Sequence, residues 1–180
     1  MRFLICMFFL IVLFSCETKN SKSEGFKENT AFNELLAIEK TIFKDVVVGK
    51  SQKISKKGKD LLMLSQAYIA SNPSDTLLER VYEMAALGAE IGGLYNDAVN
   101  YLYLAQRNFP ESEKASIYLF NRARILDDIL QKKKQSILAY QELIELYPND
   151  SISISMKAYL ESDLMQKSEA ELLDFFNSNN

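Results

Sequence analysis

The chain has 180 residues, of which 48% are apolar and 25% are charged, and this composition excludes a largely disordered polymer. It contains no histidine, which removes the usual general base near neutral pH and the commonest metal ligand, and its net charge of −3 is too small to indicate nucleic acid as a partner. Three prolines and six glycines are few turn-forming residues for this length, so we expect one helical domain or a small helical repeat array.

The first fifteen residues have the pattern of a signal peptide. Met1 and Arg2 are followed by twelve apolar residues, 3–14. As a helix this run would be about 18 Å long, which is too short for a bilayer core of about 30 Å. The lengths are typical of a secretory signal peptide, so we expect residues 1–15 to be a targeting segment.

Cys16 directly follows that segment. The run Leu13-Phe14-Ser15-Cys16 resembles the lipobox of bacterial lipoproteins, although Phe14 departs from the small or aliphatic residue that is usual there. The resemblance implies that Cys16 becomes the first residue after cleavage and carries acyl chains, and two or more chains anchor a protein stably. The alternative is a free thiol behind an ordinary signal peptide.

Residues 16–30 are polar apart from Phe26. This composition predicts a flexible tether between the membrane surface and a helical domain over residues 31–180. In the lipoprotein families that this segment resembles, Asp after the lipidated Cys favours retention in the inner membrane. Glu17 stands at that place, which points towards the outer membrane.

The first predicted helix, over residues 31–48, is followed by the stretch that fits a helical repeat least. Its apolar side consists of Leu35, Ile38, Ile42 and Val46. Residues 48–59 then read as a long loop, whose lysines are Lys50, Lys53, Lys56, Lys57 and Lys59. The ordinary interpretation is a solvated, mobile loop, and the alternative is a contact with anionic lipid or with an acidic partner.

The prolines set a period of 37 and 38 residues, because they lie at Pro73, Pro110 and Pro148. A Ser or Asp that is able to cap a helix follows each one, and proline itself ends the helix before it. Positions 12, 8, 5 and 1 before each proline share one helical face. These positions hold Leu61, Ser65, Tyr68 and Asn72, then Ala98, Leu102, Ala105 and Phe109, and then Ser136, Tyr140, Leu143 and Tyr147. We therefore expect three similar helices, each ending at a proline turn.

Two further helical hairpins are predicted upstream of the last two prolines. In the middle unit, which begins at Leu78, the pair Gly92-Gly93 separates two helices. In the third unit the turn is expected at residues 131–134. After Pro148, residues 151–165 read as a helix, although the alternation Ser-Ile-Ser-Ile-Ser would also suit a strand. Residues 168–176 begin with a capping-box pattern and predict a short terminal helix that closes the array.

The middle unit resembles the tetratricopeptide (TPR) pattern, in the form Tyr82-x2-Ala85-Ala86-x2-Ala89…Ala98-x3-Leu102…Pro110. With residues 13–16, 118–150 and 167–176, it makes the chain similar to TPR lipoproteins of the Gram-negative envelope, such as the outer-membrane-protein assembly lipoprotein and the periplasmic coordinator of the Tol–Pal system. The resemblance implies an all-α, TPR-like solenoid of about three hairpins plus C-terminal capping helices. It also implies an outer-membrane lipoprotein facing the periplasm, with protein partners of the cell envelope.

The sequence holds no pattern typical of an enzyme. Gly92-Gly93 lacks the spacing of a phosphate-binding loop, no serine lies in a Gly-x-Ser-x-Gly turn, and no cysteine pair or carboxylate cluster has metal-ligand spacing. We therefore expect no catalytic activity, no metal and no cofactor.

The first helix of each pair is expected to form the concave wall of the array. By repeat position this wall would present Arg80, Glu83, Leu87 and Glu90, then Arg124 and Asp128. A mixed charged and apolar wall suits a partner peptide or helix, although these residues would also suit an ordinary exposed helix face. The sequence thus favours a membrane-anchored scaffold with a long open groove. The rival is a ligand-capturing lipoprotein for a small solute or peptidoglycan fragment, which would need one polar and aromatic pocket.

Overall fold

The chain is seen in a computed structural model that describes residues 29–47 and 51–162. It forms α1 (Thr30–Val47), α2 (Ser51–Ser71), α3 (Leu78–Ile91), α4 (Tyr95–Asn108), α5 (Ala115–Arg124), η1 (Ile125–Ile129), α6 (Lys133–Leu146) and α7 (Ser151–Glu161). The segment η1 is a π-helical turn that continues α5. No strand occurs in either described range, so this part of the chain is all-α, as the sequence predicts.

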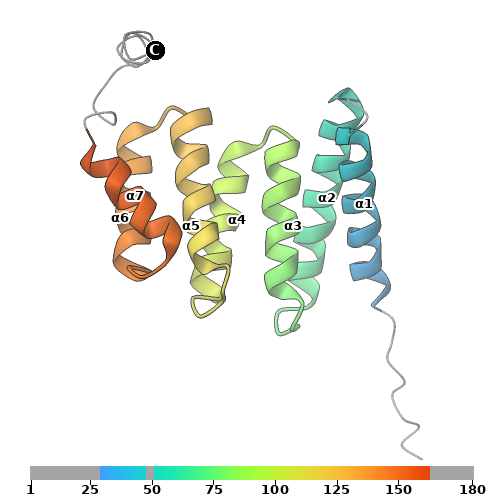
Figure 1. Cartoon of the computed structure of the whole chain (residues 1–180). Helices are drawn as coiled ribbons and strands as arrows, with labels where there is room; N and C mark the ends of the chain where they lie inside the picture. The colour runs from blue at the N-terminus through green and yellow to red at the C-terminus, as the bar shows by residue number, and fades with distance from the viewer. Residues whose placement is uncertain (1–28, 48–50, 163–180) are drawn as a thin grey trace, which may run out of the picture.

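The helices stand side by side in chain order, as Figure 1 shows. Each helix packs against the next one, with the odd-numbered helices in one layer and the even-numbered helices in the other. The core lies between these layers in three apolar clusters, around α1–α3, around α2–α5 and around α5–α7. Helices α1 and α7 are therefore the two ends of the row.

The three proline turns have the same local geometry. In each one, the polar residue two positions after the proline accepts a hydrogen bond from the backbone N–H two residues further on. The donor–acceptor distance is 2.8 Å at Asp75, 3.1 Å at Ser112 and 2.7 Å at Asp150. The N–H of each of these residues also donates to the carbonyl of the residue before the proline. The predicted capping residues are confirmed, and the turn recurs with the period of the prolines.

The predicted stripe of the second helices is also confirmed. In α2, α4 and α6 the first three positions of the stripe are almost inaccessible, with exposed fractions between 0% and 7%. This holds even in α2, where Ser65 takes the place of a large apolar residue. Burial at these positions therefore depends on the helical register more than on the size of the side chain.

Ser65 gives a first testable prediction, because its hydroxyl is fully buried without a hydrogen-bond partner in the described part of the chain. An unsatisfied buried hydroxyl costs about 1–3 kcal/mol, so Ser65→Ala should raise the free energy of unfolding by about 1 kcal/mol. Ser136 is the matched control, since it is equally buried but donates to the Lys133 carbonyl at 2.9 Å. Ser136→Ala should give no gain in urea denaturation, and equal gains from both variants would contradict this reasoning.

The extra residue that makes the second period 38 lies in the π-helical turn. Helix α3 has 14 residues, whereas its counterpart has ten residues in α5 and five in η1. After this point the backbone returns to the same geometry, since Gly93 and Gln131 have φ of 76° and 54°. A π turn is a one-residue insertion in an α-helix, so the hairpin absorbs the residue without changing its turn. The predicted turn at 131–134 is wrong in its bounds, because α6 begins at Lys133.

The long loop predicted for residues 48–59 is wrong. Helix α2 begins at Ser51, so Lys53, Lys56, Lys57 and Lys59 lie on a helix, while Lys50 falls outside the described residues. The stretch resembles a loop because a run of lysines with a glycine disfavours a helix in isolation. Tertiary packing overrides that tendency, because Gly58 is needed for contact with α3.

Helices α2 and α3 touch backbone to backbone at three glycines. A Cβ atom added to Gly58 would lie 2.6 Å from the Gly92 nitrogen, and one added to Gly88 would lie 2.7 Å from the Gly58 oxygen. Real Cβ atoms do not approach other atoms this closely. The close contact therefore exists only because none of these residues has a side chain.

The last described helix resolves one alternative of the sequence. Residues 151–161 form α7, so the helical interpretation of the Ser-Ile alternation is confirmed and the strand is excluded. The expected capping helix at 168–176, the signal peptide, Cys16 and the tether all lie outside the described residues. Among the described helices, none is both long enough and apolar enough to span a bilayer.

Candidate binding groove

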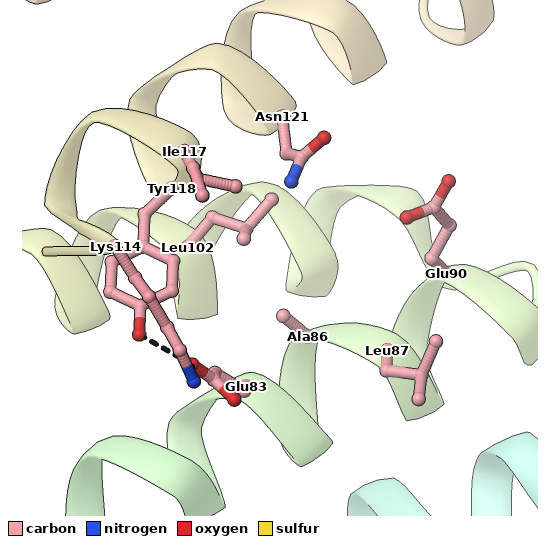
Figure 2. Close-up of a pocket in the computed structure, with 9 residues that line it drawn as sticks. All are labelled: Glu83, Ala86, Leu87, Glu90, Leu102, Lys114, Ile117, Tyr118 and Asn121. Atoms are coloured by element: carbon pink, nitrogen blue, oxygen red, sulfur yellow. Dashed lines mark hydrogen bonds and ion pairs between the residues drawn. The ribbon is translucent and has the colours of Figure 1, made fainter. Parts of the chain in front are cut away.

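An open hollow of about 320 Å³ lies between α3 and α5, above α4. We call it the α3–α5 groove, and Figure 2 shows its lining residues. They are Glu83, Ala86, Leu87 and Glu90 of α3, Leu102 of α4, and Lys114, Ile117, Tyr118 and Asn121 at and after the start of α5. Residues from two consecutive hairpins thus form one surface.

The floor of the groove is apolar. Ala86, Leu102 and the Tyr118 ring are buried, with exposed fractions of 5%, 7% and 3%. The small side chain of Ala86 leaves space above α4, while Leu87 is half-buried and Ile117 is 41% exposed at the rim. An apolar side chain of a partner would therefore gain burial by entering the groove.

One end of the groove is a charged cluster around Glu83. The Tyr118 hydroxyl lies 2.6 Å from Glu83 Oε1 and 2.7 Å from Glu79 Oε1, so it is shared between two carboxylates one helical turn apart. Lys114 Nζ lies 2.7 Å from Glu83 Oε1 (Figure 2). Burial, with hydrogen bonds to Glu83 and Glu79, raises the pKa of Tyr118 well above its usual value.

Arg80 extends this cluster to a third helix. Its guanidinium lies 2.9 Å from Glu83 Oε2 and 2.5 Å from Oε2 of Glu39 on α1, whose side chain is only 9% exposed. Burial opposes ionisation of Glu83, but hydrogen bonds from Lys114, Tyr118 and Arg80 outweigh it and hold the pKa of Glu83 below its usual value. The network therefore joins α1, α3 and α5 along the layer that lines the groove.

The other end of the groove is closed by an ion pair. Arg124 of α5 lies 2.7 Å from Glu90 of α3. Asn121 lies one turn before Arg124, and Figure 2 shows its amide on the groove side of α5. Since an amide both donates and accepts hydrogen bonds, Asn121 is suited to contact the backbone of a bound peptide.

The structure brings together most of the residues that the sequence placed on the concave wall. Glu83, Leu87 and Glu90 line the groove, and Arg80 and Arg124 are ion-pair partners of its two acidic ends. Asp128 is not part of the lining: it is exposed, and its carbonyl accepts a hydrogen bond from the Gln131 side chain at 2.9 Å. The π turn lies between Arg124 and Asp128 and changes the helical phase on which the repeat alignment relies.

Sequence reasoning missed the α5 side of the groove. Ile117 stands 37 residues after Arg80, so the proline period itself could have identified it. Tyr118 carried no such signal, because its pattern predicts a core residue and its ring is indeed buried. Only the fold shows that its hydroxyl emerges beside Glu83.

The groove has the chemistry of a binding surface. Its charged groups are paired with one another, and its floor is apolar. Within residues 29–47 and 51–162, no group of three or more His, Cys, Asp or Glu side chains is arranged to hold a metal ion. Comparison of the chain with family models found no match, and searches of curated proteins and of solved structures found no match either.

Proposed function

We propose that the protein is a TPR-like scaffold, anchored to the outer membrane through acylated Cys16, that binds segments of other cell-envelope proteins in the α3–α5 groove. The repeated hairpins support the TPR-like architecture, because the proline turns and the glycine-type turns recur at the same spacing with the same backbone geometry. The lipobox-like run at residues 13–16 supports the anchor.

The groove is the observation that carries the proposed function. It is open, it spans two hairpins, and it combines an apolar floor with an amide and paired charges at its ends. This combination suits a peptide segment, which offers alternating apolar side chains and backbone amides. The exposed part of Ile117 at the rim is the natural first contact.

A photo-crosslinking side chain at position 117 tests the groove. In intact envelopes of a Gram-negative host, the Ile117 variant should form discrete protein adducts. The matched control is the same side chain at Leu138 of α6, which is 65% exposed but does not line the groove. Adding Leu87→Glu should remove the adducts at position 117. Equal adducts from both positions, or adducts insensitive to Leu87→Glu, would exclude the groove as the binding site.

The rival function, capture of a small solute or peptidoglycan fragment, predicts a different outcome for the same protein. The groove volume is at the lower end of small-molecule sites, which measure about 300–1,000 Å³. Native mass spectrometry of the protein purified from envelopes would then show a small bound molecule, and position 117 would give no protein adduct.

The anchor is tested separately by Cys16→Ser. Without a sulfur nucleophile no acyl chain is attached, so this variant should leave the membrane fraction after cell disruption. Replacing Ser15 by Ala keeps a small residue before Cys16 and is the matched control, which should stay membrane-bound. A Cys16→Ser variant that remains in the membrane fraction would disprove the lipid anchor.

A further inference from the structure

The free end of the α1–α2 hairpin exposes apolar side chains that its packing leaves uncovered. Phe43 is 55% exposed, Val46 is 52% exposed and Val47 is 87% exposed. The sequence places Val46 on the same side of α1 as Leu35 and Ile42, which are buried at 1% and 0%. The apolar side of α1 therefore continues past the point where the rest of the array covers it.

The same hairpin end is strongly basic. Residues 40–47 and 51–60 contain six lysines against two aspartates, a local net charge of +4, whereas the whole chain has a net charge of −3. One of these lysines, Lys57, pairs with Asp45 at 2.6 Å and ties the two helices together. Lys53 and Lys56 are exposed and form no ion pair within the described ranges, so their charges are available to a partner.

We propose that this hairpin end binds the surface of an anionic lipid bilayer. Phe43, Val46 and Val47 would enter the boundary between headgroups and acyl chains, and the lysines would contact lipid phosphates. Exposed apolar residues beside a basic cluster are the combination that interfacial membrane binding uses. The contact needs neither the acyl chain on Cys16 nor the α3–α5 groove, so it goes beyond the proposed scaffold function.

The composition of this surface favours lipid over an acidic protein. Protein interfaces are enriched in arginine and depleted in lysine, whereas every basic residue of the hairpin end is a lysine. Lysine carries its charge on a long flexible stem, so it reaches phosphates while its aliphatic part stays near the apolar boundary. The surface is also a free end at one edge of the row, far from the start of α1 (Figure 1). A flat bilayer can therefore approach it without displacing another helix.

A single tryptophan provides a positional test, since the chain contains none. Phe43→Trp in the full chain should show a blue-shifted emission, and quenching by brominated lipids, with vesicles of 30% phosphatidylglycerol in phosphatidylcholine. Ile154→Trp is the matched control, because Ile154 is 59% exposed on α7 at the other end of the row. Its emission should stay that of a solvated indole. The apolar run at residues 3–14 is common to both variants, so only the position of the tryptophan distinguishes them.

The lysines are tested in the Phe43→Trp background. Each exposed lysine near an anionic surface contributes about 1 kcal/mol, which corresponds to about fivefold in vesicle affinity. Lys53→Gln with Lys56→Gln should therefore weaken binding to anionic vesicles by roughly 25-fold. Lys134→Gln with Lys157→Gln removes the same charge from exposed positions elsewhere and should change the affinity by less than about threefold.

Three results would overturn the proposal. The first is a Phe43→Trp emission that is the same with anionic and with pure phosphatidylcholine vesicles. The second is an equal loss of affinity from the two lysine pairs. The third is a shift produced by poly-glutamate but not by anionic vesicles, which would assign the hairpin end to an acidic protein.

Discussion

Gly88→Ala is expected to lower the free energy of unfolding by about 3 kcal/mol. The new Cβ would lie 2.7 Å from both the Gly58 oxygen and the Leu62 nitrogen, and both atoms belong to the backbone of α2. Neither atom can rotate away, so α2 and α3 must separate, and such overpacking costs about 1–3 kcal/mol or more. The helix propensity that alanine gains, about 1 kcal/mol, offsets only part of this cost. Thermal unfolding should show a midpoint lower by about 10 °C.

Gly93→Ala is the matched control for this variant. It is the same chemical change, but no atom of the described chain lies within 4 Å of the added Cβ. The only cost comes from the positive φ of 76°, which alanine tolerates poorly, and amounts to about 1 kcal/mol. If Gly88→Ala were no more destabilising than Gly93→Ala, the backbone contact between α2 and α3 would not be as close as described.

Arg80→Met is expected to cost about 2 kcal/mol near neutral pH. The methionine keeps most of the aliphatic volume but leaves Glu39 as an unpaired carboxylate whose side chain is 9% exposed. Removing one partner of a fully buried pair costs about 3–5 kcal/mol, and we take a lower figure because Arg80 itself is 37% exposed. Adding Glu39→Gln should recover more than half of the loss in urea denaturation. No recovery would show that the cost comes from packing and not from the charge on Glu39.

The same variant should weaken the dependence of stability on acid. The pKa of Glu83 is below its ordinary value of 4.5 in the folded protein, so the unfolded chain binds more protons as the pH falls. The stability that Glu83 contributes is therefore present above about pH 4.5 and is lost as the pH falls through its folded pKa. Arg80 is one cause of the lowered pKa, so its removal moves the folded value back towards the ordinary one.

Urea midpoints at pH 7, 5 and 3.5 measure this effect. The wild-type midpoint should fall between pH 5 and pH 3.5, and the midpoint of Arg80→Met should fall less over the same interval. Arg107→Met is a control, since the Arg107 guanidinium lies over the Tyr103 ring and not beside these carboxylates. Equal decreases for wild type and for Arg80→Met would contradict a direct effect of Arg80 on Glu83.

The local features of this fold could be predicted because each depends on residues close together in the chain. Pro73, Pro110 and Pro148 end helices through their own ring and missing N–H, whatever packs around them. The buried stripe before each proline follows from 3.6 residues per turn, so even Ser65 was placed correctly. Gly93 could be assigned to a turn for the same kind of reason, since its φ of 76° is one that glycine adopts easily.

The sequence by itself thus determined the helices, the proline turns, their period and the outline of the concave wall. Only the tertiary structure decided that the lysine-rich stretch is part of α2, because Gly58 favours a helix only when α3 approaches it. It also decided that Tyr118 joins Glu79 and Glu83, and that Asp128 lies off the groove beyond a π turn. These features depend on contacts between residues more than thirty positions apart, or on one inserted residue, and neither leaves a periodic pattern in the chain.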